Sequence, residues 1–247
     1  MSFSYGAVWE DTMALARAHA PLLTAIAGVF MFLPALLFAV YLKPPEPQTP
    51  DLSQMMRQLM DWYGEAWPWL LLQALISLVG SAAMLRLVFA RGVTVGGALL
   101  FGLTLLPFYF LMSLLTSLIV GIGLILLIVP GLYLIGRLVP STAVMVAENR
   151  RNPIDAISRT FALTAGHGWA ILGLVIIVVI VAAIVLGVAG TILGIVFVLL
   201  AGQEFGTLLK AIVESAFNSA FATLLVLLYA AIYRSLAGTG SVAETFN

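Results

Sequence analysis

The chain contains no cysteine, only two histidines and very few charged residues. Without cysteine it can form no disulfide, no thiolate metal site and no cysteine nucleophile. Charged residues make up 9% of its 247 positions, whereas ordinary globular domains carry about 25%. So few charges cannot cover a surface that faces water. The 11 basic and 11 acidic residues also balance, which excludes the basic stripe that nucleic-acid binding requires.

Catalytic motifs are missing as well. Neither His19 nor His167 has a carboxylate at metal-ligand spacing. The glycines lie within apolar runs and do not form a phosphate-binding or dinucleotide fingerprint after a strand. We therefore expect a protein that is not an enzyme and that has no metal and no other cofactor.

Apolar residues, in contrast, make up 62% of the chain. Because one transmembrane helix requires about 20 apolar residues, the long apolar runs predict an all-α, polytopic membrane helix bundle. We expect one integral membrane domain with six transmembrane helices and short interfacial amphipathic helices. The predicted spans are about 21–42, 67–90, 104–121, 124–147, 169–187 and 208–233, and residues 238–247 are predicted to form a flexible tail.

Two connections within these runs are predicted from glycine. Residues 121–123, Gly-Ile-Gly, are expected to form a minimal turn between the third and fourth spans. The glycines at 187, 190 and 194 interrupt an uncharged run that is longer than one span. They predict a broken or re-entrant segment that ends near residue 201.

Basic residues in short loops predict the orientation of the bundle. If the N-terminus lies inside, seven arginines fall on the inner side and three basic residues on the outer side. The inner residues are Arg17, Arg86, Arg91, Arg150, Arg151, Arg159 and Arg234, and the outer ones are Lys43, Arg57 and Lys210. This excess predicts that both termini are cytoplasmic.

An amphipathic helix is predicted to begin at Asn152-Pro153. Asn can cap free backbone N–H groups, and proline suits the first helical position. Asp155 and Arg159 are expected to pair at i, i+4, and the apolar face predicts a helix that lies on the inner leaflet. Residues 52–63 carry a second amphipathic stripe on the outer side.

Arg137 is the one charged residue between Gly92 and Ala147. It is expected about 15 Å from the inner end of its span, where a charge needs a partner. Pro130, Gly131 and Pro140 are predicted to break this helix, and Pro140 frees the carbonyl of Gly136. Such carbonyls could satisfy the arginine. Alternatively, the arginine anchors a lipid phosphate or another anion.

Further polar residues lie on other spans. On the last span, Lys210, Glu214 and Asn218 repeat at four-residue spacing, which predicts either an ion pair at the helix end or a hydrated crevice. Arg86 is expected to reach the inner headgroups from the second span. The predicted lipid, anion or polar intramembrane site comprises Arg137, Glu214, Asn218, Lys210 and Arg86.

Two stretches together resemble a known family. Residues 130–137 fit a PG-x-Y…R pattern, and residues 153–169 fit P-x-x-A-x-x-R…L-T-x-G-x-x-W. This combination resembles bacterial membrane domains related to those of glycerophosphodiester phosphodiesterases, and in length and layout the chain is similar to YciC-like inner-membrane proteins. The resemblance implies an inner-membrane location. The soluble catalytic barrel of those phosphodiesterases has no counterpart in the sequence, so their activity is not implied.

Three functional hypotheses follow. The first is a non-enzymatic inner-membrane protein that binds membrane lipids or has a scaffold role in envelope homeostasis. The second is a transporter or channel for a small or lipophilic solute, which predicts a continuous polar cavity that touches Arg137 and Glu214. The third is an accessory subunit that forms a homo-oligomer or binds another membrane protein, which predicts an exposed face of small residues.

Overall fold

A computed structural model describes residues 3–42, 45, 51–90 and 92–245, with side chains up to residue 238. Every element in these residues is helical, which confirms the predicted all-α class. The elements are α1 (Tyr5–Ala27), a π-helical segment η1 (Gly28–Phe32), α2 (Leu33–Tyr41), α3 (Leu52–Phe89), α4 (Val95–Leu126), α5 (Ile128–Leu138), α6 (Ser141–Ala147), α7 (Pro153–Leu163) and α8 (Gly168–Thr245). The basic residues Lys43 and Arg91, used to predict the orientation, lie outside the described residues.

Five helical segments in the described chain are long and apolar enough to cross a membrane. They are Tyr5–Tyr41, Leu52–Phe89, Val95–Leu126, Ile128–Ala147 and Gly168–Gly238. The sequence predicted six spans, and the difference lies in α8, which turns back on itself at Gly202 (φ 78°, ψ 173°). Each of its arms, residues 168–201 and 203–245, is longer than one span requires.

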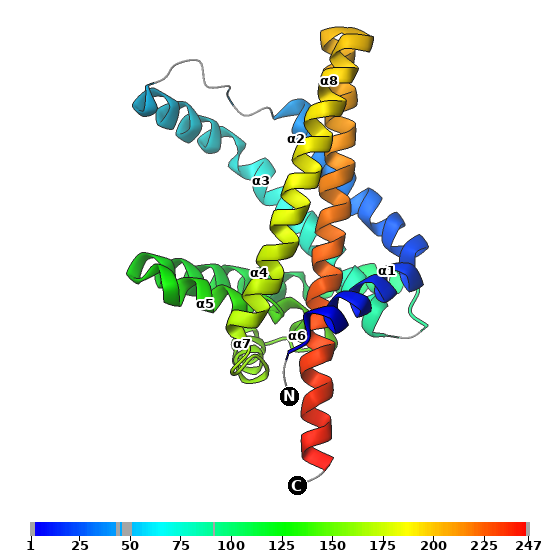
Figure 1. Cartoon of the computed structure of the whole chain (residues 1–247), viewed down its shortest axis with the longest axis vertical. Coiled ribbons are helices and arrows are strands. Elements are labelled where there is room, and N and C mark those ends of the chain that lie inside the picture. Colours follow the sequence, from blue (N-terminus) through cyan, green and yellow to red (C-terminus); the bar gives the residue numbers. More distant parts are fainter. Residues whose placement is uncertain (1–2, 43–44, 46–50, 91, 246–247) are drawn as a thin grey trace.

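The two arms of α8 form an antiparallel hairpin (Figure 1). A Cβ on Gly206 would lie 2.6 Å from Cα of Val198, and one on Gly194 would lie 3.0 Å from Cδ of Lys210. The predicted break at residues 187–201 is therefore wrong, because the helix is continuous up to Ala201. Glycines 190 and 194 allow the second arm to approach, and only Gly202 adopts the left-handed backbone that reverses the chain. Residues 238–245 continue this helix where a tail was predicted.

Helices α1 and α2 are continuous through η1. Pro34 has no N–H, while the N–H of Leu33 donates to the carbonyl of Gly28, five residues earlier. This bonding widens one turn into a π-helix. The hydroxyl of Ser219 on α8 donates to the carbonyl of Ala27, just before this turn, at 3.2 Å.

The connection between α4 and α5 lies later than predicted. Helix α4 continues through residues 121–123, and the chain turns at Leu127 (φ −156°, ψ 127°). Gly131 packs so closely that a Cβ there would lie 2.6 Å from the backbone nitrogen of Leu124. Pro130 lies in the first turn of α5, where its missing N–H costs no helical bond. Of the three predicted helix breaks, Pro140 is the one that separates two helices, α5 and α6.

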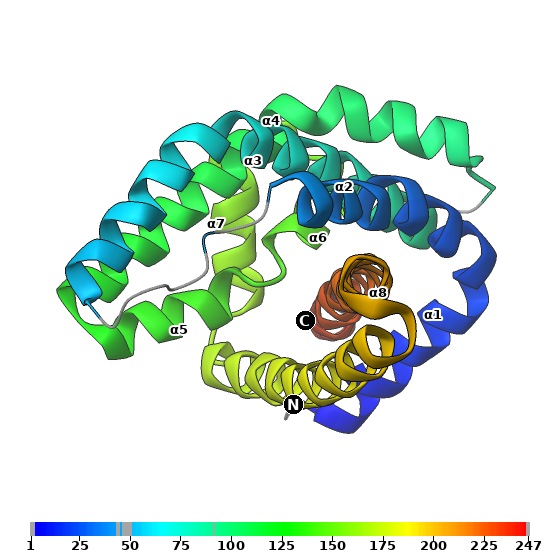
Figure 2. The same cartoon turned by 90° about the horizontal axis from the view of Figure 1, so that it is seen from above.

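The helices run in two main directions. The α8 hairpin stands upright, whereas α4 and α5 lie across its lower half (Figure 1). Viewed from above, α4 and α5 are seen lengthwise and the second arm of α8 end-on (Figure 2). The core lies where α3, α6 and this arm meet, and it includes Met84, Met145 and Leu228. The short helix α6 is surrounded by protein, since residues 143–146 are fully buried.

Candidate functional site

Arg137 lies in the last turn of α5 and bonds to the end of α7. Its Nε donates to Oγ1 of Thr164 at 2.8 Å, and one terminal nitrogen donates to the carbonyl oxygen of Phe161. The other terminal nitrogen donates to the hydroxyl of Tyr133 at 3.2 Å. The rings of Tyr133 and Phe161 also lie 5.6 and 5.1 Å from the guanidinium carbon, within cation–π distance.

Two glycines bring α5 against the start of α8. A Cβ on Gly136 would lie 2.2 Å from the carbonyl oxygen of Gly168, and one on Gly168 would lie 2.9 Å from Cδ of Arg137. The ring of Trp169 lies 5.5 Å from that of Tyr133. Small residues at helix crossings allow such close approach in membrane proteins, and here they hold Arg137 beside α7.

All three partners of Arg137 are neutral, and two of them, Thr164 and the carbonyl of Phe161, lie at the C-terminal end of α7. The sequence suggested that Pro140 frees the carbonyl of Gly136 to accept from this arginine. That carbonyl accepts none of the three hydrogen bonds that Arg137 donates. The C-terminal end of a helix carries partial negative charge, which stabilises a nearby cation. Within the described residues no carboxylate forms an ion pair with Arg137.

Helix α7 begins as the sequence predicts, but its ion pair differs. The side chain of Asn152 accepts from the N–H of Ile154 at 3.0 Å, and Pro153 is the first helical residue. Arg159, which was predicted to pair with Asp155, instead donates to Glu148 at 3.0 Å. Glu148 lies at the end of α6 and not on α7. The i, i+4 rule considers only neighbours on the same helix, so it does not predict this pair.

Glu148 is the centre of a polar cluster that the sequence did not indicate. It accepts from Arg150 at 2.6 Å, from Arg159 at 3.0 Å and from the hydroxyl of Tyr233 at 3.4 Å. Burial raises the pKa of this carboxyl, but the hydrogen bonds and charges of the two arginines outweigh burial and lower the pKa below its ordinary value. Arg234 pairs with Asp11 of α1 at 3.4 Å, so these contacts tie α1, α6, α7 and α8 together.

The polar residues on the second arm of α8 form a local pair. Nζ of Lys210 lies 3.7 Å from Oε1 of Glu214, and both side chains are 45% exposed. The amide of Asn218 donates to the backbone carbonyl of Glu214 at 2.9 Å. Glu214 packs on Gly190 of the first arm, and Lys210 packs on Gly194. Lys210 and Glu214 thus form the i, i+4 ion pair that their spacing predicts, while its predicted place at the outer surface stays a prediction.

Arg137 and Glu214 lie at different levels of the hairpin. Arg137 packs on Gly168, whereas Glu214 packs on Gly190, and 22 residues of helix separate those glycines by about 33 Å. Arg86, in the last turn of α3, has its guanidinium carbon 4.6 Å from the ring centroid of Phe101. The five predicted site residues are therefore not brought together in one site.

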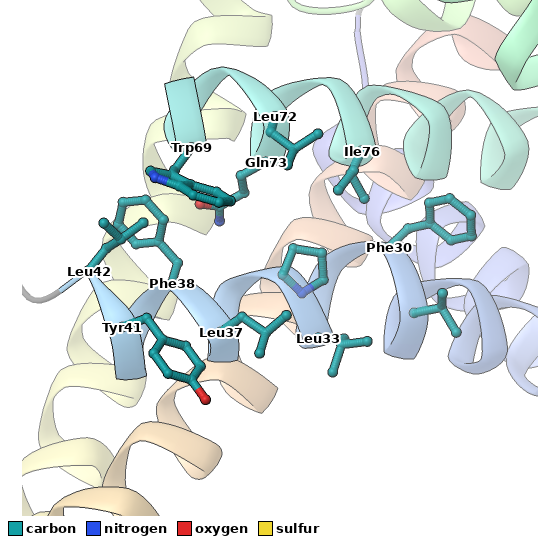
Figure 3. Close-up of a pocket in the computed structure, with 12 residues that line it drawn as sticks. Phe30, Leu33, Leu37, Phe38, Tyr41, Leu42, Trp69, Leu72, Gln73 and Ile76 are labelled. Carbon is teal, nitrogen blue, oxygen red and sulfur yellow. The ribbon is translucent and has the colours of Figure 1, made fainter. Parts of the chain in front are cut away.

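An apolar groove with a volume of about 820 Å³ lies between α2 and α3. Ligand pockets commonly measure about 300–1,000 Å³. Leu33 and Leu37 line the wall on α2, and Trp69, Gln73 and Ile76 line the wall on α3 (Figure 3). We call this cavity the α2–α3 groove. The i, i+4 spacing of residues 33, 37 and 41 is the signal in the sequence that could have indicated its α2 wall.

A second, smaller groove of about 460 Å³ lies between α1 and the second arm of α8. Small residues make up much of its lining, including Ala16, Ala20, Gly28, Ala216, Ser219 and Ala220. The π-helical segment η1 separates the two grooves, since Phe30 lines the first and Phe32 the second.

Comparison with family models, with curated proteins and with solved structures finds no match for this chain.

Proposed function

We propose that the chain is a non-enzymatic protein of a bacterial inner membrane that binds membrane lipid. In this proposal both termini are cytoplasmic, and neither a cofactor nor nucleic acid takes part. The α2–α3 groove holds an acyl chain of a phospholipid. The observation that carries the proposal is the apolar lining of this groove within a chain whose helices are compatible with membrane insertion.

The chemistry of the groove suits an acyl chain with a polar end. Aliphatic side chains such as Leu33 and Leu37 provide the apolar wall. Tyr41 and Trp69 lie at the end near Leu42, and such rings favour the boundary between lipid and water. Gln73 supplies the amide of the lining, which can donate a hydrogen bond to a lipid ester.

Arg137 offers a separate contact for lipid headgroups. Its charge is held at the end of α7 without an acidic partner in the described chain. A lipid phosphate is an anion that such a guanidinium binds well. This contact supports lipid binding at the inner side, whereas the groove supports it towards the outer side.

Photocrosslinking of the protein in its native membrane tests the proposal. A phospholipid with a photoreactive group in its acyl chain is incorporated, and modified peptides are mapped by mass spectrometry. We expect adducts on residues 33–42 and 69–76, above the level on other lipid-facing helices. Equal labelling of all exposed apolar helices would contradict a specific acyl site.

A matched pair of variants tests occupancy of the groove. Leu37→Trp fills the groove, while Leu118→Trp places the same ring on α4; the native side chains are 49% and 53% exposed. Native mass spectrometry counts the phospholipids that remain bound after detergent washing. Leu37→Trp is expected to lose bound lipid, and the α4 variant is expected to retain it. Equal counts would refute the site.

The two other hypotheses fare differently. Transport by a continuous polar path has little support, because Arg137 and Glu214 lie about 33 Å apart along the hairpin and both grooves are mainly apolar.

The small residues of the second groove favour a subunit role, since they would admit a helix of another membrane protein or of a second copy. Co-purification with Ala220→Leu as the interfering variant tests that role.

A further inference from the structure

The chain between Gly92 and Gly136 contains no charged residue and forms α4 and most of α5. The apolar length of this segment suggests two membrane crossings. A crossing pair needs both helices to span about 30 Å of hydrocarbon. Helix α5 has 11 residues and is about 16 Å long, so the segment Ile128–Ala147 reaches the length of a crossing only by including α6, beyond the break at Pro140.

The inner end of α5 is fixed by its contacts with α7. Arg137 donates to Thr164 and to the carbonyl of Phe161 at the end of that helix. Charged side chains lie along α7 and its approach, among them Arg151, Asp155 and Arg159. These charges hold α7 at the boundary with water, so Arg137 lies at the same level and not deep in the membrane.

This anchor limits how far the tip between α4 and α5 can reach. Leu127 at the turn is ten residues from Arg137, which is a rise of about 15 Å at most. The tip therefore reaches about the middle of the bilayer and cannot reach the outer surface.

Helix α4 must then be strongly inclined. Its 32 residues are about 48 Å long, and near its start the ring of Phe101 lies 4.6 Å from the guanidinium carbon of Arg86. If Arg86 is at the inner headgroups, α4 begins at that level and ends at a tip that lies no more than about 15 Å deeper. A rise of about 15 Å over about 48 Å of helix corresponds to a mean inclination of about 20° to the membrane plane. Figures 1 and 2 show that α4 and α5 lie across the axis of the α8 hairpin, as such an inclination requires if the hairpin crosses the membrane.

The tip has the chemistry of a segment in hydrocarbon. Residues 125–129 read Ile-Leu-Leu-Ile-Val, and all five are exposed, with Ile125 at 87%. The turn of α8, in contrast, is followed by Gln203 and Glu204. The backbone of the tip also bonds internally, since Leu127 donates to the carbonyl of Gly123 and Gly131 donates to that of Leu127. These two bonds close the turn between α4 and α5.

We propose that the α4–α5 hairpin is a re-entrant element of the inner leaflet. It enters from the cytoplasmic side, places residues 125–129 among the acyl chains of that leaflet and returns to the same side. The hairpin thus has a lipid surface as its partner. The proposal rests on the membrane location proposed above, but not on the α2–α3 groove.

The absence of cysteine makes this topology directly measurable. Single variants Ile125→Cys, Gln203→Cys and Ser158→Cys are expressed in the native membrane and treated with a membrane-impermeant maleimide. Intact cells with a permeable outer layer report the outer side, and inverted vesicles report the inner side. All three native side chains are exposed in the structure.

We expect Gln203→Cys to be labelled from outside and Ser158→Cys from inside. Ile125→Cys is expected to stay at background from both sides and to be labelled after detergent is added. Labelling of Ile125→Cys from outside would show a crossing hairpin, and labelling from inside would show a tip in the cytoplasm. Failure to label in detergent would show a tip covered by protein. Each of these three results overturns the proposal.

The control sites separate this inference from the proposed orientation. If Gln203→Cys and Ser158→Cys exchange sides, the orientation is wrong while the result for Ile125→Cys still decides the hairpin. A repeat with Val129→Cys, on the other side of the turn, guards against a local effect of one substitution. It is expected to behave like Ile125→Cys.

Discussion

Gly136→Ala tests the contact that positions Arg137. A Cβ at this position would lie 2.2 Å from the carbonyl oxygen of Gly168 and 2.9 Å from Cβ of Leu172. Neither atom is the free end of a flexible side chain, so α5 and α8 must move apart. This movement also pulls Arg137 away from its acceptors on α7.

The expected magnitude combines three effects. Overpacking of a close contact costs about 1–3 kcal/mol, and weakening one hydrogen bond of a charged donor costs about 1.5 kcal/mol or more. Alanine regains about 1 kcal/mol of helix propensity relative to glycine. We therefore expect Gly136→Ala to lower the free energy of unfolding by about 1.5–3.5 kcal/mol.

Gly187→Ala is the matched control. Gly187 also lies inside a helix, but no neighbouring atom lies within 4 Å of its ideal Cβ position. Here the substitution is expected to raise the free energy of unfolding by about 0.5–1 kcal/mol. Reversible unfolding in mixed micelles with increasing dodecyl sulfate, followed by circular dichroism, measures both variants. Equal midpoints would refute the close crossing of α5 and α8, and with it the geometry described for Arg137.

Three further predictions concern side-chain contacts and use the same assay. Glu148→Gln is expected to lower the free energy of unfolding by about 1–2 kcal/mol at neutral pH. Because the folded pKa lies below the ordinary value of 4.5, this contribution is present above about pH 4.5 and is lost as the pH falls through the folded pKa; a difference independent of pH would contradict the cluster. Arg137→Lys should cost about 1–3 kcal/mol, nearly as much as Arg137→Leu, since lysine lacks the guanidinium fork, and a stable lysine variant would argue against the three bonds. Tyr109→Phe removes the 3.1 Å bond to Ser81 and should cost about 0.5–1.5 kcal/mol, whereas an unchanged midpoint would show that the bond contributes nothing.

Local signals in the sequence predict helix starts well. The beginning of α7 follows from Asn152-Pro153, because a cap and a proline act within one turn. The break at Pro140 is similarly local. Glycine is a weaker signal, since it permits a turn, as at Gly202, or a close helix crossing, as at Gly136. The sequence does not distinguish these uses, and the predicted breaks at residues 121–123 and 187–194 were wrong for this reason.

The partners of charged side chains on other helices could not be predicted, because local sequence patterns do not show which helices pack together. The ion pair of Arg159 with Glu148 joins residues 11 apart across a loop, and the bonds of Arg137 join α5 to α7. Basic residues cannot distinguish a crossing α4–α5 hairpin from a re-entrant one, because either returns the chain to the same side. The resemblance to the phosphodiesterase-related membrane domains and to YciC-like proteins stays a prediction.

The π-helical turn at η1 makes the α2–α3 groove depend on the number of residues before it. Successive residues of an α-helix are about 100° apart around the axis, so a π-turn shifts every later side chain by that angle. Deleting one residue from 28–32 would restore α-helical bonding and rotate Leu33, Leu37 and Tyr41 away from α3. The proposed lipid binding would then be lost, although the remaining residues that line the groove would be unchanged. The loss of a single codon would thus abolish the proposed function without altering the hydrophobicity on which membrane insertion depends.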